Sequence, residues 1–574
     1  MGKRFSAASS SSKKEAQERS SLPIHKVFKL PSSLPPWPSS SFSSSSGGGG
    51  GFGSGHIDLG GLQVCQISTF NPVWSTYDGG PDNLGATVFE PSSLPDGYSI
   101  LGYYAQPNNE PLFGWVLVGR DISPAGGVVL RQPSDYALVW TSESLKISQT
   151  KPAYVWVPVP PEGYRAVGHV VTTSPEKPPA DRVMCVRADF TEECETETWV
   201  WSPGKSSSDP NGFNLYLLRP RNNRGTKGLG VSVGTFAAAH NNNNKTTTLS
   251  SLSCMKNNNS TPFSSMPNLV QIKALFQQYS PVLYFHPKET YLPSSVNWFF
   301  ANGSALYKRG DQSNPVPVHP DGANLPRGSG SDDGTYWLDL PPGKPARDAV
   351  KKGDLESSEV YLHVKPMLGG MFTDVVVWVF YPFNGPATAK VGPVDVPLGR
   401  TGEHVGDWEH LTLRISNFDG VLYRIYFSAH SGGAWVETPR LEFLEGGGNK
   451  PAAYASRNGH ANYSKPGAVL QGLGDEVGLR NDTAKGGLVL DCGRKYTVVA
   501  AEGVAEPPWL NYAGKWGPVI RYSAGREAEA VKGALRGSLK GKFESVVDLL
   551  PAEVYGEEGP TGPKLKDSWS GDEK

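Results

Sequence analysis

The stretch GEHVGDWEHLTLRI, residues 402–415, combines an alternating apolar pattern with a dense set of ionisable side chains. From Leu411 to Ile415 apolar and polar residues alternate, which predicts a β-strand. Residues two apart in a strand share a face, so Asp407 and Glu409 are expected to point the same way as these core-facing residues. Two carboxylates beside an apolar face are unfavourable unless a cation or a proton neutralises them. The pattern therefore predicts a functional site.

A hairpin is expected next, because a turn signal at residues 416–420 precedes a second strand-like run. A four-residue loop would place Glu409 opposite Ser428 and Asp407 opposite His430. A single β-bulge would shift this register and turn His430 to the other face.

The residue types at this site favour a divalent cation. Carboxylates suit Ca²⁺, Mg²⁺ or Mn²⁺, whereas a second histidine favours Mn²⁺ or Zn²⁺. Two alternatives stay open: Asp407 and Glu409 pair with backbone amides or with Arg414 or Arg424, or they serve as an acid/base pair. The predicted metal ligands are His404, Asp407, Glu409, His430 and Asp395.

The run Asn458-Gly-His460-Ala-Asn462-Tyr463 predicts a second group of ligand-binding residues. Gly459 permits a tight turn that presents the imidazole of His460. We expect His460, Asn462 and Tyr463 to contact a ligand.

The composition favours an all-β cytoplasmic protein. The 574 residues exceed one ordinary domain, and a net charge of −1 provides no global field for nucleic acid. Turn formers (67 Gly, 49 Pro) accompany 15 Trp, 23 Tyr and 22 Phe. The five cysteines lack any C-x-x-C pair, which is typical of reduced thiols. Residues 375–383 are the most apolar run and fall far short of the roughly 20 residues that span a bilayer.

Low-complexity segments predict the domain boundaries. We expect residues 1–57 and 561–574 to be disordered tails and the Asn/Ser/Thr-rich residues 222–265 to be an interdomain linker. The two domains, 58–221 and 266–560, are then expected to be independent.

An internal repeat lies in the first domain. Val73-Trp-Ser-Thr76 recurs 66 residues later as Val139-Trp-Thr-Ser142, and a partial third copy begins at Val200. Leu94-Pro-Asp-Gly-Tyr98 recurs at the same offset as Pro160-Pro-Glu-Gly-Tyr164. Three such units predict a pseudo-threefold β-prism, and the alternative is an unrelated β-sandwich.

The second domain is expected to be β-sandwich-like with a few peripheral helices. Residues 269–276 have the apolar spacing of an amphipathic helix, and strands are predicted at 279–287, 359–365, 374–383, 408–415, 421–429 and 487–500. Surface helices are predicted within 527–550.

Signals for an enzyme are weak. No nucleophile elbow, phosphate-binding glycine loop or His-Glu-x-x-His occurs. The alternative is a glycosidase-like hydrolase that uses Asp407 and Glu409. Jelly-roll glycosidases carry a third acid three residues on, where this chain has Thr412.

Three strings, YSPVLYFHPKETYLPSSVNWFF (279–300), GEHVGDWEHLTLRI (402–415) and YASRNGHANY (454–463), resemble the plant vacuolar protein sorting-associated protein 62 family. The resemblance covers about residues 58–560. The repeat region is similar to the β-prism domains of multivesicular-body-associated proteins, some of which contact acidic membranes. The resemblance implies a role in vacuolar sorting.

His404-x-x-Asp407-Trp-Glu409 also looks like the heptapeptide of the necrosis- and ethylene-inducing peptide-like toxins. That resemblance implies that His404, Asp407 and Glu409 surround a divalent cation. This chain departs from the motif at Glu403 and Gly406.

Together these features predict a non-enzymatic, two-domain all-β protein. We expect it to bind a membrane lipid or glycan head group, peripherally on endomembranes, and not to bind nucleic acid. Its cofactor is predicted to be Ca²⁺, Mg²⁺ or Mn²⁺.

Overall fold

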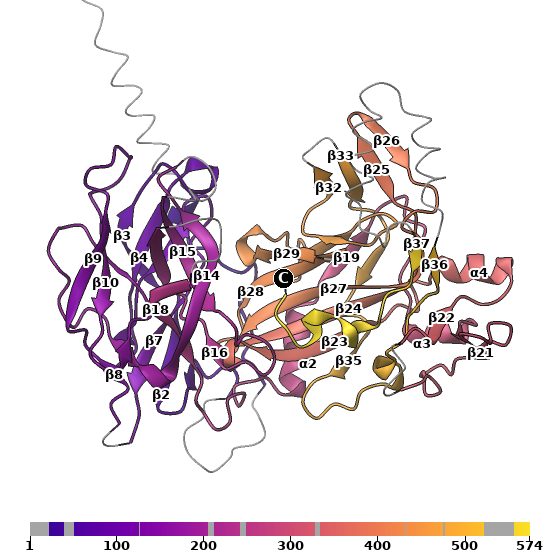
Figure 1. Cartoon of the computed structure of the whole chain (residues 1–574), viewed down its shortest axis with the longest axis horizontal. Helices are drawn as coiled ribbons and strands as arrows, with labels where there is room; N and C mark the ends of the chain where they lie inside the picture. Colours follow the sequence, from indigo (N-terminus) through magenta and orange to yellow (C-terminus); the bar gives the residue numbers. More distant parts are fainter. Residues whose placement is uncertain are drawn as a thin grey trace, which may run out of the picture.

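The computed structural model describes residues 22–38, 51–124, 127–204, 212–240, 248–327, 333–430, 432–473, 477–521 and 556–573. Within these ranges the protein is all-β, as predicted, and forms two domains that lie side by side (Figure 1). The predicted helices within 527–550 lie outside the described residues.

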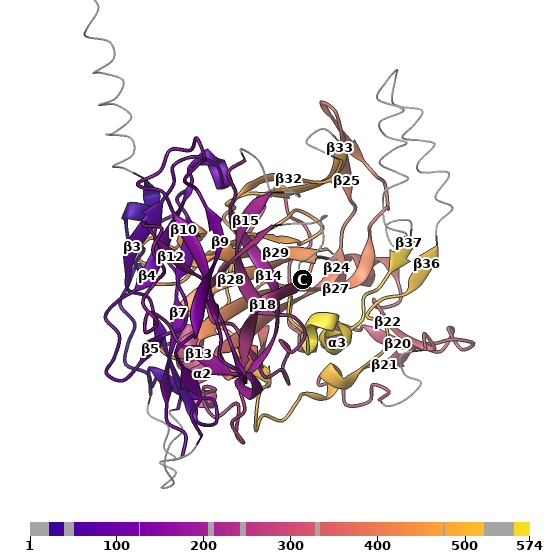
Figure 2. The ribbon, with the colours of Figure 1, turned by 60° about the vertical axis from the view of Figure 1, so that its left-hand side comes forward.

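The N-terminal domain contains three copies of a small antiparallel sheet. Figure 2 turns this domain toward the viewer and places β3 and β4 beside β10 and β12. The sheets are β3 (Phe70–Ser75), β4 (Ala86–Pro91) and β6 (Tyr104–Pro107); β9 (Asp135–Thr141), β10 (Tyr154–Val159) and β12 (Val170–Thr172); and β14 (Thr191–Trp201), β15 (Phe213–Pro220) and β17 (Phe236–His240) with β16 (Gly230–Val231) and β18 (Thr248–Lys256).

Two further sheets complete this domain. They contain β1 (His56–Asp58), β2 (Leu62–Ile67), β7 (Val116–Asp121) and β5 (Ser99–Ile100) in one, and β8 (Leu130–Arg131), β13 (Cys185–Arg187) and β11 (Tyr164–Arg165) in the other.

The repeated tryptophans meet at the centre of the prism. The ring centroids of Trp74 and Trp140 are 6.2 Å apart, those of Trp74 and Trp201 are 5.4 Å apart, and those of Trp140 and Trp201 are 5.9 Å apart. All three pairs are edge-to-face, the geometry that aromatic quadrupoles favour. One residue from each repeat therefore builds a common pseudo-threefold core.

The predicted linker at 222–265 is wrong, because it contains the strands that complete the third repeat. Gly234 follows Gly168, and Gly168 follows Gly102, at the same 66-residue interval that separates Trp74 and Trp140. A Cβ on Gly168 would lie 2.9 Å from the Cα of Gly102 and 2.8 Å from the Cβ of Thr235, so the repeats approach closely here. The Asn-rich composition of the segment concealed this third copy.

The C-terminal domain is a sandwich around a six-stranded sheet. One apolar core lies between this sheet, a four-stranded sheet and α2, and a second core covers the opposite face. In spatial order the six strands are β29 (Gly432–Glu437), β28 (Leu422–Ala429), β27 (His404–Ser416), β24 (Phe372–Asn384), β23 (Val360–Met367) and β35 (Tyr496–Ala500), and the four are β31 (Asn462–Tyr463), β30 (Ala452–Ala455), β19 (Val282–Phe285) and β34 (Val489–Asp491).

Smaller elements surround the sandwich. The helices are α2 (Leu269–Tyr279), α3 (Val296–Ala301) and α4 (Lys344–Lys351), and the strands are β20 (Ala305–Lys308), β21 (Val316–Pro317), β22 (Tyr336–Asp339), β25 (Thr388–Val391), β26 (Val394–Pro397), β32 (Gly467–Leu473), β33 (Val477–Thr483), β36 (Val519–Arg521) and β37 (Gly556–Glu558).

The two domains share an apolar core, so the predicted independence of the domains is wrong. Trp115 of the prism lies 5.3 Å from Phe372 of the sandwich, centroid to centroid. Phe113 packs in the same way 5.2 Å from Tyr423. Asn257, in the supposed linker, donates a hydrogen bond to the carbonyl of Gly369 at 2.7 Å. Each domain therefore completes the other's core.

Both predicted tails are also wrong where the structure describes them. Ile24 is buried in the prism, and the Trp37 indole donates a hydrogen bond to the Asp419 carbonyl at 2.8 Å. At the other end, Trp569 packs on the sandwich and Glu573 is buried. Composition describes the average character of a segment, whereas a few buried side chains are enough to hold the segment on the protein. The serine block of residues 39–46 lies outside the described residues.

We predict that Trp74→Ala destabilises the protein by about 3–5 kcal/mol, because it removes one third of the aromatic core of the prism. Leu138→Ala is the matched control, since that side chain on β9 is 49% exposed; it should change stability by about 0.5 kcal/mol or less. Urea denaturation followed by tryptophan fluorescence and circular dichroism measures both. Equal effects of the two substitutions would contradict a shared tryptophan core.

Candidate functional site

The acidic pair lies on the central strand of the sandwich, on the face predicted from the sequence. In β27, Asp407 is opposite Tyr381 of β24, and Glu409 is opposite Val379. Farther along the strand, Leu411 belongs to the core between the two sheets. Asp407 and Glu409 are each only 7% exposed. Both carboxyls are therefore enclosed by protein.

His460 holds the Asp407 carboxylate. Its Nδ1 lies 2.9 Å from Asp407 Oδ2, and its Nε2 donates to the Tyr291 carbonyl at 3.0 Å. The imidazole also stacks on the Tyr381 ring, with centroids 3.8 Å apart and planes 5° apart. Both polar partners of the ring are acceptors, so an ionised Asp407 requires a proton on each ring nitrogen. The pair is then an imidazolium–carboxylate ion pair.

The two carboxyls have opposite protonation preferences. Burial raises the pKa of Asp407, but the hydrogen bond from His460 and the charge of His404 outweigh burial and hold that pKa below its usual range. Burial and the neighbouring Asp407 charge together hold the pKa of Glu409 well above its usual range. Glu409 is thus the protonated member of the pair at neutral pH.

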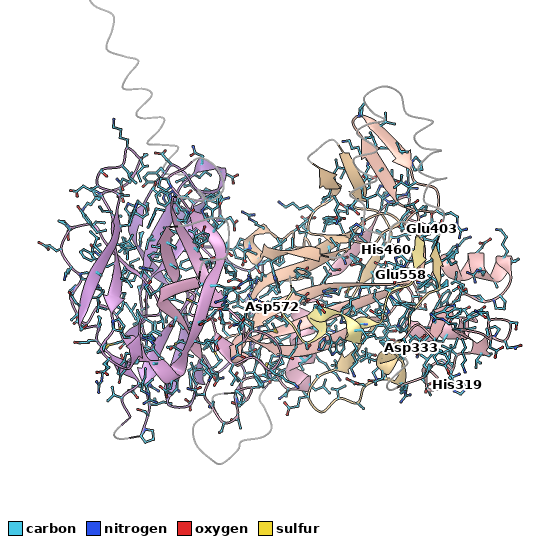
Figure 3. The ribbon with its side chains drawn as sticks, in the orientation of Figure 1. His319, Asp333, Glu403, His460, Glu558 and Asp572 are labelled. Atoms are coloured by element: carbon cyan, nitrogen blue, oxygen red, sulfur yellow. The ribbon has the colours of Figure 1, made fainter. Side chains whose placement is uncertain are left out.

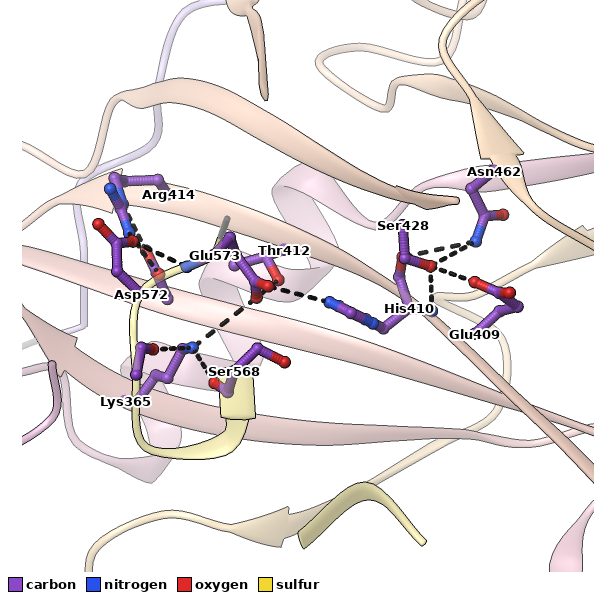
Figure 4. Close-up of polar contacts among 12 residues, drawn as sticks. Lys365, Glu409, His410, Thr412, Arg414, Ser428, Asn462, Ser568, Asp572 and Glu573 are labelled. Atoms are coloured by element: carbon purple, nitrogen blue, oxygen red, sulfur yellow. Dashed lines mark hydrogen bonds and ion pairs between the residues drawn. The ribbon is translucent and has the colours of Figure 1, made fainter. Parts of the chain in front are cut away.

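A hydrogen-bonded shell surrounds Glu409 (Figure 4). The Ser428 hydroxyl donates to Glu409 Oε2 and accepts the His410 backbone N–H at 3.0 Å. The Asn462 amide lies 3.4 Å from the same hydroxyl. Burial, with a smaller effect of the nearby Glu409 carboxyl, raises the pKa of Tyr463 to about 12. Asn462 and Tyr463, predicted as ligand contacts, therefore line this acidic group.

The other predicted ligands make their hydrogen bonds and ion pairs with other groups, although His404 is close enough for its charge to act on Asp407. His404 is half-buried, and its Nδ1 is 2.7 Å from the Gly406 carbonyl. His430 contacts Asn481 through Nε2 at 2.9 Å. Asp395, on β26, forms an ion pair with Arg480. The described contacts bring His460, not these three side chains, onto Asp407.

The predicted pairing of Asp407 with His430 is wrong because the hairpin contains a β-bulge. The loop closes as expected, with the Ser416 N–H donating to the Val421 carbonyl at 2.9 Å. The register then shifts between Arg414 and Ile415, where one extra residue enters β28. Sequence alternation cannot locate such an insertion.

The group is arranged as a closed polar network rather than an open active site. Figure 3 shows His460 inside the sandwich domain. A protonated and an ionised carboxyl side by side is the pattern of acid/base chemistry, yet both are almost fully covered. Across the described ranges, no three His, Cys, Asp or Glu side chains are placed to hold one metal ion. The divalent cation stays a prediction.

Two contributors to the network were not identified from the sequence. Tyr381 provides the stacking surface, and Tyr291 provides a backbone carbonyl. Tyr381 lies in the apolar run predicted as a buried strand. Its burial was therefore expected, but its stacking on His460 was not. A backbone carbonyl leaves no signal in side-chain patterns.

The sequence model of a family described as vacuolar protein sorting-associated protein 62 matches residues 24–573. Vacuolar protein sorting-associated protein 62 of Saccharomyces cerevisiae is 29% identical over 172 residues, covering 26% of this chain and 35% of the yeast protein. The putative vacuolar protein sorting-associated protein TDA6 of the same yeast is 26% identical over 175 residues, covering 26% and 36%. The matched part thus spans about a third of these relatives.

The solved structures that match are more distant. GNIP1Aa from Chromobacterium piscinae has 21% identity and a TM-score of 0.28, covering 39% of this chain and 41% of that one. Necrosis and Ethylene inducing Protein 2 from the agent of witches' broom disease of cocoa has 15% identity and a TM-score of 0.18, covering 33% and 67%. Likenesses this weak carry no argument about function.

We predict that Glu409→Gln stabilises the protein progressively as pH rises. The folded pKa of Glu409 is raised above the unfolded value of about 4.3. Between the two values unfolding releases a proton, so the free energy of unfolding falls by about 1.4 kcal/mol per pH unit. Glutamine does not titrate, so its advantage should vanish near pH 4 and grow as pH rises toward the folded pKa of Glu409. Urea denaturation across this range measures the difference.

Asp407→Asn is the matched control with the opposite sign. The lowered pKa of Asp407 contributes stability above the unfolded pKa, which is lost as pH falls through the folded value. The asparagine variant should therefore be destabilised at neutral pH. Parallel pH profiles of the two variants would contradict the assignment of one ionised and one protonated carboxyl.

Proposed function

The chain belongs to the vacuolar protein sorting-associated protein 62 family, and on this premise we propose that it is a non-enzymatic, peripheral membrane protein of vacuolar protein sorting. In this proposal the prism binds lipid head groups on the cytosolic face of endomembranes. The supporting observation is an apolar loop bordered by three arginines.

The loop between β7 and β8 exposes two apolar side chains. Ile122 is 38% exposed and Val128 is 46% exposed. The base of the loop is held by Asp121, whose carboxylate accepts the backbone N–H groups of Ser123 and Val129 at 3.0 Å and 2.6 Å. Apolar side chains presented on such a fixed base are able to insert into a head-group layer.

Three arginines border this loop on the sheet β8–β13–β11. Arg131 of β8 pairs with Cys185 of β13, and Arg165 of β11 pairs with Val186 of β13. Arg187 donates its backbone N–H to the Val129 carbonyl at 2.9 Å, and so lies at the base of the loop. Arg131 and Arg165 are exposed and Arg187 is half-exposed.

This combination suits reversible binding to an anionic membrane. Basic side chains near an anionic leaflet contribute about 1 kcal/mol each, and the attraction decays over a Debye length. The two apolar side chains can add burial in the head-group region. None of the described helices has the length and apolar character to cross a bilayer.

A glycosidase-like activity has less support. Retaining and inverting glycosidases need both carboxyls open to the sugar. Here Asp407 is held by His460 and Glu409 by Ser428, and each is 7% exposed. Substrate access would require opening the sandwich.

We predict that the full chain floats with vesicles that contain phosphatidylserine or phosphoinositides, and floats less as salt increases. The double substitution Ile122→Asp/Val128→Asp should reduce the bound fraction at least about tenfold, because it removes the apolar contact and adds negative charge. Co-flotation at low and physiological salt measures the effect.

Leu138→Asp is the matched control, since Leu138 is 49% exposed on the prism but lies on β9. It should leave flotation unchanged. Retained binding in the double variant, or binding only to neutral glycolipid vesicles without salt dependence, would contradict the proposal.

We further propose that Asp407 and Glu409 take up Ca²⁺, Mg²⁺ or Mn²⁺ when Glu409 loses its proton. A metal competes with that proton, so stabilisation should be larger at pH 8 than at pH 6. We expect the cation to raise the melting temperature, with a gain of about 2.7 kcal/mol at one hundred times its dissociation constant. Thermal melts with chelator and with each ion measure it.

The Asp407→Asn variant should lose that increment, because it removes a ligand charge. His319→Ala, at an exposed histidine of the same domain, should retain it. A wild-type protein that responds to none of the ions at either pH would contradict the cation proposal and leave the membrane proposal unaffected.

A further inference from the structure

The sheet face opposite the acidic pair carries a row of charged side chains. Strand register aligns Lys365 of β23, Asp374 of β24, Arg414 of β27, Arg424 of β28 and Glu437 of β29. Two arginines therefore stand directly opposite each other, an arrangement that is unfavourable without a nearby anion. Asp374 binds Arg414 through two hydrogen bonds of 2.8 Å.

Residues 567–573, here called the strap, place two carboxylates on this face (Figure 4). Asp572 accepts a hydrogen bond from Arg414 at 2.6 Å. Glu573 accepts one from the Thr412 hydroxyl at 2.7 Å and lies 3.3 Å from His410 Nε2. The Glu573 side chain is 2% exposed. The strap thus buries two carboxylates against basic and hydrogen-bond-donating side chains of this face.

The strap is also recognised through its backbone and its aromatic ring. The Lys365 ammonium, 1% exposed, donates to the carbonyls of Ser568 and Gly571 at 2.6 Å and 3.0 Å and lies 3.7 Å from Glu573. The Trp569 indole stacks on His363, with centroids 3.7 Å apart and planes 16° apart.

Within the described residues, every recorded polar partner of the Lys365 ammonium belongs to the strap. Without the strap, Lys365 and the hydroxyl of Thr412 would be left without partners in an otherwise buried setting. An unpartnered buried cation is strongly unfavourable. The face is therefore incomplete unless an anionic ligand covers it.

We propose that Lys365, His410, Thr412 and Arg414, with His363, form a binding site for an aromatic–acidic peptide of the spacing Trp-x-x-Asp-Glu. The strap occupies this site in cis. A partner protein that presents the same spacing takes the site when the strap leaves.

Peptide recognition fits the contacts better than a lipid phosphate does. Lys365 reads two peptide carbonyls in addition to a carboxylate, and a phosphorylated head group offers no such carbonyl pair. The His363 ring provides a stacking surface for an indole, next to the charged side chains of this face. Arg414 contacts a single oxygen of Asp572 through Nη2, which it shares with Asp374, while its Nε also binds Asp374.

The electrostatics support a carboxylate ligand. Burial alone would raise the pKa of Asp572, but Arg414, Arg424 and Arg224 together lower it to about 2. Burial is likewise outweighed at Glu573, where the hydrogen bond and charge of His410 and the charge of Lys365 lower the pKa. Both strap carboxyls are therefore ionised when bound at neutral pH.

In the test, the chain is cut before the strap, so that a free peptide with the same sequence can replace it. A recognition sequence for a specific protease is inserted after Leu565, which is 45% exposed, and the folded chain is then cut. A fluorescent peptide of residues 566–574 is titrated into the cut protein, and anisotropy measures binding. We expect saturable exchange, and binding at least about a hundredfold weaker to the uncut chain, where the tethered strap competes.

Peptide variants separate recognition from charge alone. Trp569→Ala and the pair Asp572→Asn/Glu573→Gln should each weaken binding at least about tenfold, because each removes a buried contact or charge partner. Ser570→Ala is the control and should bind like the native peptide, since the Ser570 side chain is exposed and its contact to Thr226 uses the backbone carbonyl.

A second variant tests the proposal in case the chain with the inserted protease site does not fold. In the full chain with Asp572→Lys/Glu573→Lys, the strap is repelled by Lys365 and Arg414, and the free native peptide should bind this variant but not wild type. The proposal is overturned if the native peptide fails to bind both forms, or if the neutralised peptide binds equally well. Binding of anionic vesicles in place of the peptide would also overturn it.

Discussion

The central constraint on this protein is that β27 is buried on both faces. It pairs along its whole length with β24, and apolar cores cover the two sides of the sheet. The buried charged side chains on β27 therefore depend on partners inside the protein, because water is largely excluded from them. The chemistry of both faces follows from that requirement.

The two faces meet the requirement in different ways. On one face, the loop between β30 and β31 places His460 beside Asp407, and β28 places Ser428 beside a protonated Glu409. On the other face, the partners come from the far end of the chain, since Asp572 and Glu573 reach Arg414 and Thr412. The network around Asp407 and Glu409 is closed by elements of the sandwich. The network on the other face depends on the strap, which a competing peptide can replace. That difference makes the strap face the better candidate for regulated binding.

The prism contributes to this arrangement through its shared core with the sandwich. Trp115 packs on Phe372, the first residue of β24, so the prism covers the end of the central sheet. Arg424, which faces Arg414 across the sheet, also forms an ion pair of 3.0 Å with Glu197 of the prism. A membrane-bound prism and a peptide-binding sheet would thus be joined through one rigid contact rather than through a flexible linker.

The sequence by itself determined the all-β class, the tryptophan repeat of the prism and the common face of Asp407 and Glu409. These are consequences of local periodicity: alternation sets the face of a strand, and a repeated motif sets a repeated packing position. Only the tertiary structure decided the partners. The bulge in the β27–β28 pairing displaced His430, and His460 reached Asp407 from the loop between β30 and β31. Composition made residues 222–265 and 561–573 look like linker and tail, because docking depends on a few anchors such as Gly234 and Trp569 that meet distant surfaces. Pairing between distant segments is set by the whole packed core, and no local pattern encodes it.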